Sequence, residues 1–527
     1  MKRRDFVKMG LVSSAAATQA MPAFGKTAAA LAEADVTQLG AAMANGSQSA
    51  VSLTRACLAR IAAVDRAGPR INAIIELNPD ALAIAAELDR ERAAKRVRGP
   101  LHGIPVLLKD NIATGDRMRT SAGSLALAGA PAAQDAHVVQ QLRAAGAVIL
   151  GKTNLSEWAN LRSTRSTSGW SARGGLTLNP YALDRNTSGS SSGSGAAVAA
   201  GLAPLAVGTE TDGSIVSPAS VCGLVGIKPT VGLLSRSGII PLSPSQDTAG
   251  PMARSVADAV LLLNGMTGLD PRDAASKGAT GRPRDYAEFL QKDGLRGARI
   301  GVARNFFGNN DRLDALIERA LGVLRAQGAI LIDPVEIPNT DKYSESELNV
   351  LLYEFKAALP QYLATYAPTA PVRNMADVIA FNLQHSAREL KYFGQEYLLR
   401  AEAKGALDSA DYRAALANNL RYSQAEGIDQ VIREHQLDAL VAPTGSPAWL
   451  TDTINGDHSG ASFTSPAAVA GYPHITVPAG LLQGLPVGLS FVGGAWSEPV
   501  LIRLAYAFEQ ASRYRRAPEF ARSAARG

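Results

Sequence analysis

The stretch TSGSSSGSG at residues 187–195, followed by AAVAAGLAPLAV (196–207) and GTETDGS (208–214), decides how this chain of 527 residues is interpreted. A flexible Gly/Ser linker would not run directly into the apolar residues 196–200, which predict a helix capped by the first glycine- and serine-rich burst. Residues 205–207 predict a short buried strand that carries the second burst at its carboxyl end. Catalytic loops of open α/β sheets lie at that end. We therefore expect a functional site at the second burst.

The residues after Ser214 predict another helix, because IVSPAS (215–220) is a favourable helix start directly after Gly213 and Ser214. The first backbone N–H groups of a helix have no partner within it and carry partial positive charge. We therefore expect Gly213 and Ser214 to present free backbone N–H groups. Such groups stabilise the negative oxygen that forms when a carbonyl is attacked.

A lysine at the end of an upstream strand supplies a candidate base. GIPVLLKDN (103–111) predicts an apolar strand that ends at Lys109, beside an apolar wall. Taken alone, an ordinary surface lysine at a strand end is the commoner interpretation. The two serine-rich bursts favour a catalytic one.

Two familiar motifs also match, and their local context argues against both. GSSSG (189–193) fits the nucleophile elbow with Ser191 at its centre, but the elbow needs a strand directly before it, and residues 179–186 are typical of a loop. GAVILGKT (146–153) fits the phosphate-binding P-loop, yet its strand-like residues 147–150 lie inside the motif. Gly146 instead ends a helix predicted over 135–145. We expect neither a Ser191 nucleophile nor a nucleotide site.

The three segments together resemble the amidase signature family, and the similarity runs from about residue 39 to about residue 514. The family's lysine ends a G-[IV]-P-x-x-x-K-D strand, which corresponds to Lys109. Its bridging serine lies in G-G-S-S-G-G-S, which corresponds to Ser190, and its nucleophile ends G-T-[DE]-T-G-G-S, which corresponds to Ser214. The resemblance implies a Ser-cisSer-Lys triad with no cofactor. It also implies an oxyanion hole made by the backbone N–H groups of Thr211, Asp212, Gly213 and Ser214.

This triad needs no histidine if Lys109 is neutral. Lowering the lysine pKa from about 10.4 to the useful range of about 7–8 requires roughly 4 kcal/mol, which burial of an ammonium group supplies. The resemblance implies that Ser190 relays the proton between Lys109 and Ser214 and helps to return it to departing ammonia. It also implies a cis peptide bond before Ser190, where Gly189 removes one side-chain clash.

The resemblance is closest to members that act on peptide amides. It implies hydrolysis of a carboxamide to a carboxylic acid and ammonia, at the C-terminal amide of peptides, through an acyl-enzyme. Asp212 stands where most members have glycine, and Val216 stands where many have an arginine, whose absence argues against an acidic substrate. Three alternatives stay open: a broad small-molecule or aryl acylamidase, the glutaminase subunit of a tRNA-dependent amidotransferase, and an inactive periplasmic binding protein of the same fold.

The N-terminus, MKRRDFVK followed by a weakly apolar, alanine-rich stretch to about residue 23, resembles a twin-arginine export signal. We expect residues 1–25 to be a signal peptide, too short for a stable membrane span, and the enzyme to be periplasmic or secreted. An ordinary basic N-terminus is the alternative. Residues 26–527 are then expected to form a single amidase domain.

The net charge of +6 describes the ends of the chain rather than its interior. Residues 1–8 carry +3 and residues 513–526 carry +4, so the remainder is close to neutral. This distribution predicts no basic face for nucleic acid. A substrate amide is the only expected partner, with no obligatory protein partner and no stable membrane insertion.

Cysteine and histidine usage indicates no metal site and no disulfide framework. Cys57 lies on a predicted amphipathic helix and Cys222 in an apolar run, so we expect two buried thiols, although an exported protein leaves their pairing open. The six histidines show no metal-ligand spacing.

Alternating patterns predict an α/β fold, and the resemblance implies a large mixed sheet sandwiched between helices. Residues 344–434 are almost entirely helical in pattern, and they resemble the helical insertion that shapes the substrate entrance of the family. Its aromatic residues are expected mainly to pack between helices. The other predicted helices are 36–45, 50–66, 80–96, 135–145, 255–266, 312–327 and 497–513, and the other predicted strands are 104–108, 147–150, 299–303, 329–335, 439–443 and 474–478.

Overall fold

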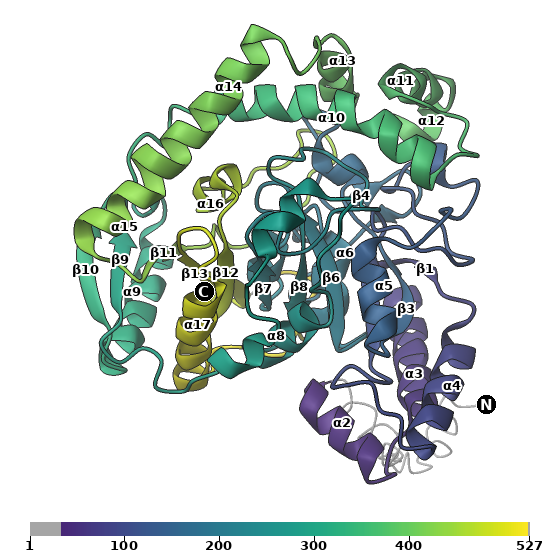
Figure 1. Ribbon diagram of the computed structural model, residues 1–527, viewed down its shortest axis with the longest axis horizontal. Helices are drawn as coiled ribbons and strands as arrows, with labels where there is room; N and C mark the ends of the chain where they lie inside the picture. Colours follow the sequence, from purple (N-terminus) through teal and green to yellow (C-terminus); the bar gives the residue numbers. More distant parts are fainter. Residues whose placement is uncertain (1–32, 525–527) are drawn as a thin grey trace, which may run out of the picture.

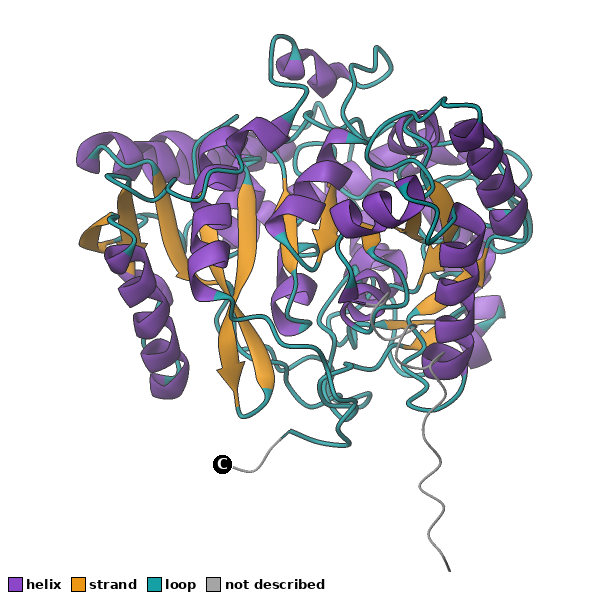
Figure 2. Ribbon diagram, turned by 90° about the horizontal axis from the view of Figure 1, so that it is seen from below, coloured by secondary structure: helices purple, strands orange, loops and turns teal. Residues whose placement is uncertain are grey.

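Eleven strands form one mixed sheet at the centre of the molecule, with helices on both of its faces (Figure 1, Figure 2). The computed structural model describes residues 33–524, so the predicted export signal over residues 1–25 lies outside the described part of the chain. In spatial order the strands are β1 (Ile74–Leu77), β3 (Val148–Thr153), β2 (Pro105–Lys109), β6 (Leu205–Glu210), β8 (Thr248–Ala253), β7 (Val225–Lys228), β12 (His474–Leu482), β13 (Leu485–Val492), β11 (Ala439–Pro443), β9 (Arg299–Ala303) and β10 (Ile330–Val335). A separate hairpin consists of β4 (Trp170–Ser171) and β5 (Gly175–Leu176).

The strand pairing changes from parallel to antiparallel across the sheet. β2 lies between β3 and β6 and runs parallel to both, and β9 runs parallel to β10 and β11. The strands between these two groups pair antiparallel. Because β2 and β6 are parallel, their carboxyl ends meet at one edge of the sheet. This topology brings the end of the lysine strand to the second glycine-rich burst.

Helices surround the sheet, and those between β10 and β11 form an arc along one side of it (Figure 1). Within the described range, residues 344–435 contain helices as their only regular structure, as the sequence predicts. The helices are α2 (Val36–Ala44), α3 (Ala50–Arg60), α4 (Ala81–Ala93), α5 (His137–Ala144), α6 (Ser192–Ala199), α7 (Val216–Val221), α8 (Val256–Asn264), α9 (Asp311–Ala326), α10 (Ser344–Tyr366), α11 (Met375–Gln384), α12 (Ser386–Glu389), α13 (Glu396–Glu402), α14 (Ala410–Leu420), α15 (Asp429–His435), α16 (Ser465–Ala470) and α17 (Glu498–Ser512).

The predicted α/β fold, with its large mixed sheet and helical insertion, is confirmed. The sequence pattern misses β1, β7, β8 and β13. β8 is the instructive case, because Pro251 pairs with Val207 in the interior of the sheet, where proline is normally excluded. β7 has only four residues and gives a weak signal.

The long helix α10 packs into the main core through residues that the sequence analysis assigned to helix packing. Phe355 and Tyr362 are buried in the same apolar cluster as the sheet, whereas Tyr392 is exposed. A proline, Pro360, lies inside α10. The insertion is therefore packed against the sheet domain over its first helix.

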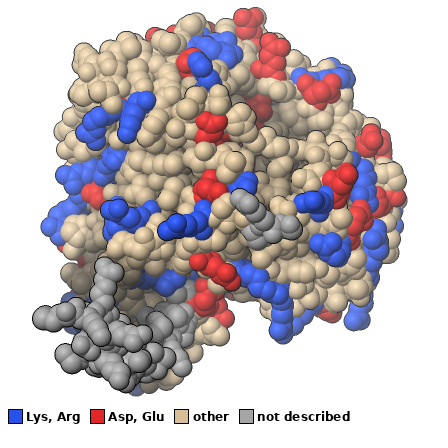
Figure 3. Space-filling view, turned by 180° about the vertical axis from the view of Figure 1, so that it is seen from behind, with Lys and Arg blue, Asp and Glu red and all other residues tan. Residues whose placement is uncertain are grey.

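Three further properties of the described residues bear on the sequence analysis. Cys57 and Cys222 are both buried and are free thiols. No helix in the described range combines the length and the apolar character needed to cross a bilayer. The face of the molecule in Figure 3 carries Lys and Arg interspersed with Asp and Glu.

Candidate active site

Lys109 ends β2 beside the last residues of β6, where the register pairs Leu108 with Val207. Its ammonium Nζ donates to Ser190 Oγ at 2.7 Å, to Thr209 Oγ1 at 2.9 Å and to the Thr209 carbonyl at 3.1 Å. The lysine and Ser190 are both fully buried. The structure therefore brings two of the three predicted triad residues into direct side-chain contact.

Burial is the main reason that the pKa of Lys109 falls from 10.5 to about 7. The negative charges of Asp247 and Glu210 act in the opposite direction and limit the decrease. A lysine with this pKa is substantially neutral at neutral pH, which a general base requires.

Ser190 is held by the backbone on both sides. The Gly189–Ser190 peptide bond is cis, and the Ser190 carbonyl accepts a hydrogen bond from the Ser156 N–H at 3.1 Å. A Cβ atom added to Gly189 would lie 2.2 Å from Ser156 Oγ, so only glycine fits at this position. The first burst is therefore a rigid buried loop, and its last residues already belong to α6.

Ser191, the centre of the rejected elbow motif, braces β6. Its hydroxyl donates to the Thr209 carbonyl at 3.0 Å and accepts from the Thr209 N–H at 3.2 Å. Residues 179–186 contain no strand, so the elbow lacks its required context.

The second burst forms the loop between β6 and α7, with Gly213 at a positive φ of 75°. The free N–H groups lie slightly earlier than a helix-terminus argument suggests. Glu210 Oε2 accepts from the N–H groups of Ile215 at 2.7 Å and Val216 at 3.0 Å, so these first helical donors are occupied. In the described part of the chain, no acceptor bonds the backbone N–H groups of Thr211, Asp212, Gly213 and Ser214.

Ser214 lies at the end of this loop, and its exposed fraction is 8%. Its carbonyl accepts a hydrogen bond from the Ser191 N–H at 3.1 Å, which places it directly beside the Ser190 loop. No hydrogen bond joins its hydroxyl to another described residue. Ser214 is thus next to the Lys109–Ser190 pair through backbone contact.

Side chains from three other elements brace the nucleophile loop. Thr211 Oγ1 donates to Asp247 Oδ1 at 2.6 Å, and burial raises the pKa of Asp247 to about 6. Ser465 Oγ donates to Asp212 Oδ2 at 2.6 Å. Gln246 Nε2 donates to Glu347 Oε1 at 2.9 Å, and Glu347 lies on α10. The helical insertion therefore contacts the loop that carries Ser214.

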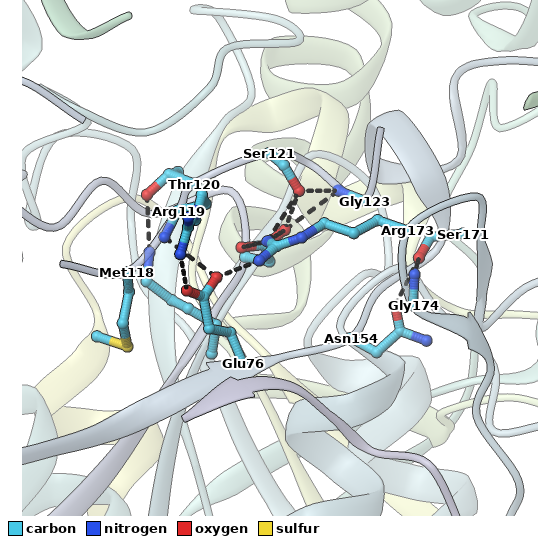
Figure 4. Close-up of polar contacts among 12 residues, drawn as sticks. Glu76, Met118, Arg119, Thr120, Ser121, Gly123, Asn154, Ser171, Arg173 and Gly174 are labelled. Carbon is cyan, nitrogen blue, oxygen red and sulfur yellow. Dashed lines mark hydrogen bonds and ion pairs between the residues drawn. The ribbon is translucent and has the colours of Figure 1, made fainter. Parts of the chain in front are cut away.

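An ion-pair network lies on the other side of the lysine strand (Figure 4). Asp110, directly after Lys109, is fully buried and accepts from Arg173 Nη1 at 3.1 Å and from the Ser121 hydroxyl. Arg173 also pairs with Glu76, which accepts from Arg119 Nη1 at 3.2 Å. This network fixes the end of β2, and the sequence analysis did not identify it.

The P-loop pattern is a coincidence of sequence. β3 occupies residues 148–153, so most of the motif is an extended strand and cannot cradle a phosphate. Lys152 is fully buried and donates to the Ile112 carbonyl at 2.6 Å and to Thr120 Oγ1 at 2.8 Å. Among residues 33–524, no three His, Cys, Asp or Glu side chains are grouped as metal ligands would be.

The fold and the lysine–serine site define this chain as an amidase, a hydrolase that acts on carbon–nitrogen bonds. It belongs to the Amidase family, which it matches over residues 52–502. It is 44% identical to a probable amidase of Arabidopsis thaliana over 87% of this chain and 86% of that protein.

Solved structures and a second group of relatives narrow the similarity. The native peptide amidase from Stenotrophomonas maltophilia is 56% identical, with a TM-score of 0.88 over 93% of this chain and 99% of that one. A glutamyl-tRNA(Gln) amidotransferase component from Chloroflexus aurantiacus is 38% identical over 90% of this chain and 96% of that protein.

Proposed function

We propose that this amidase hydrolyses the C-terminal carboxamide of peptides through an acyl-enzyme on Ser214. One observation carries the mechanism: fully buried Lys109 bonds Ser190 Oγ at 2.7 Å, and burial lowers its pKa to about 7. A neutral amine in hydrogen-bond contact with a serine hydroxyl is a competent start of a proton relay.

The proposed reaction has two halves. Ser214 Oγ attacks the amide carbon, its proton passes to Ser190, and the proton of Ser190 passes to Lys109. The unpaired N–H groups of the 211–214 loop hold the developing oxyanion. Collapse of the tetrahedral intermediate breaks the C–N bond, and the proton returns through Ser190 to the leaving ammonia. Water then hydrolyses the ester by the same relay.

The substrate assignment is supported by the similarity to the peptide amidase structure. The amidotransferase relative favours a second candidate, a glutaminase activity that serves such an assembly, at lower identity. A broad small-molecule or aryl acylamidase and an inactive binding protein are the remaining alternatives, and the buried lysine–serine contact argues against the inactive one.

A substrate panel tests the proposal. Mass spectrometry follows a C-terminally amidated peptide, glutamine, a simple aryl amide and an anilide with the wild type, Ser214→Ala and Ser191→Ala. We expect conversion of the peptide amide to the acid by the wild type and by Ser191→Ala, and none by Ser214→Ala. Loss of activity in Ser191→Ala alone would contradict the assignment of the nucleophile. Cleavage of only glutamine or only the anilide would contradict the substrate.

A further inference from the structure

A small pocket lies beside the lysine strand, under the long helix of the insertion. The first residues after β2, the turn at Glu157–Asn160, the loop at 240–242 and α10 line it, and none of its lining residues is charged. The residues that matter below are Asn111, Trp158, Ile240, Leu242 and Phe355. The last three give it apolar walls.

Two polar atoms in this pocket have no partner. Asn111 Oδ1 and Trp158 Nε1 are both buried, and neither forms a hydrogen bond with any residue in the range 33–524. The Asn111 side chain is fixed at its other end, because Nδ2 donates to Thr209 Oγ1 at 2.9 Å. Buried polar atoms are normally bonded, so an unpaired acceptor and an unpaired donor in one pocket need an explanation.

The pocket is connected to the reaction centre on two sides. On one side, Thr209 Oγ1 bonds both Asn111 and the ammonium group of Lys109. On the other side, the N–H of Leu242 donates to Asp247 Oδ2 at 2.8 Å, and Asp247 holds Thr211 of the nucleophile loop. A group bound in the pocket would therefore lie close to the scissile amide.

The backbone of the pocket wall is in an unusual conformation. Ala122, Trp158 and Ala159 have positive φ angles of 49°, 50° and 50°, and the Trp158 N–H donates to the Ala122 carbonyl at 3.0 Å. Non-glycine residues rarely adopt these angles, and they cluster at functional sites. The wall is held in the orientation that directs the indole ring of Trp158 to the pocket.

We propose that this pocket binds a secondary amide of the substrate, the acylamino group next to the scissile carboxamide. Asn111 Oδ1 accepts the N–H of that group, and Trp158 Nε1 donates to its carbonyl, while Ile240, Leu242 and Phe355 contact the adjoining apolar atoms. The inference rests on the proposed function and extends it, because it explains how an N-acylated amino acid amide is distinguished from a simple carboxamide.

A comparison of two substrates with two variants tests the pocket. N-acetylphenylalaninamide carries the acylamino group, and 3-phenylpropanamide has the same aromatic side chain and carboxamide without it. Trp158→Phe removes the indole N–H but keeps an aromatic ring against Phe355. We expect it to lower kcat/KM for the first substrate about three- to tenfold more than for the second, the range of one neutral hydrogen bond. Trp496→Phe, on the loop after β13, is the matched control and is expected to affect both substrates equally.

Each outcome decides one proposal. An equal decrease for both substrates in Trp158→Phe would overturn the pocket assignment and leave the peptide amidase proposal intact. If the wild type cuts 3-phenylpropanamide but not N-acetylphenylalaninamide, the proposed function fails. Calorimetry with Ser214→Ala and Ser214→Ala/Trp158→Phe then still tests the pocket: weaker binding of N-acetylphenylalaninamide by the double variant supports it, and equal or undetectable binding in both overturns it.

Discussion

Two buried lysines on neighbouring strands, Lys109 and Lys152, show which features make a base. β2 and β3 are parallel, and Lys152 pairs with Leu108 rather than with Lys109, so the two side chains point to opposite faces of the sheet. Burial is the main cause of both pKa decreases, to about 7 for Lys109 and about 8 for Lys152. Their partners differ: Lys109 meets the Ser190 hydroxyl, whereas Lys152 donates to a carbonyl and a threonine.

A lowered pKa therefore does not identify a catalytic lysine by itself. Structural networks perturb pKa values as strongly as active sites do. What separates the two residues is that only Lys109 contacts a hydroxyl that leads to a further serine. Lys152 instead serves the packing of the loop after β2.

The sharpest test of this comparison replaces each lysine by methionine, which has a similar length. We expect Lys109→Met to lower kcat about 10²- to 10⁴-fold, because the nucleophile loses its base. Lys152→Met should change kcat by less than about tenfold, since no reacting group contacts it. Steady-state kinetics on folded protein, checked by circular dichroism, would measure both. Comparable losses in the two variants would mean that the partners do not distinguish the lysines.

The network behind Lys109 predicts an effect on stability. Arg173 and Arg119 bind the same carboxylate, Glu76, but the exposed fraction of the Arg173 side chain is 14% and that of Arg119 is 43%. Arg173→Met leaves fully buried Asp110 without its cation and should cost about 3–5 kcal/mol of unfolding free energy. Arg119→Met should cost only about 0–1 kcal/mol. Urea unfolding of both variants provides the measurement, and equal losses would contradict the role of burial.

The pH dependence assigns the base to one lysine. Lys109 acts in its neutral form, so activity is present above its pKa of about 7 and is lost as the pH falls. We expect kcat/KM to decrease about tenfold per pH unit below that value for a substrate without ionisable groups. Lys152→Met should keep the same inflection. An inflection that moves in this variant would assign the titration to the wrong face of the sheet.

The sequence predicts the Lys109 half of this comparison better than the other half. Lys109 ends an apolar strand and matches a family motif, as do Ser190 and Ser214. The Arg173–Glu76 pair joins residues 97 positions apart, and no local pattern reports such a contact. Lys152 lies in a segment whose spacing imitates a phosphate loop. Long-range contacts between charged side chains are set by packing, which periodicity does not describe.

The same effect of burial on an acid gives the smallest predicted effect, at the contact between α10 and the nucleophile loop. Burial, followed by a contact with Asp212, raises the pKa of Glu347 well above 4.5. Asp212 Oδ1 is buried and has no other donor among residues 33–524, so a protonated Glu347 completes its hydrogen bonding. A raised pKa means that the folded state binds more protons than the unfolded state, so this group lowers stability progressively as the pH rises above about 4.5.

Glu347→Gln keeps the donor and removes the titration. We expect thermal unfolding to show a variant that gains stability over the wild type as the pH rises from about 5 to about 8. Glu347→Ala leaves the Asp212 oxygen without a donor and should cost about 1–3 kcal/mol across that range. A glutamine variant whose difference from the wild type does not depend on pH would show that Glu347 is ionised in the folded protein. The acid side of the site would then differ from Lys109 and Lys152, because burial would not have kept this group neutral.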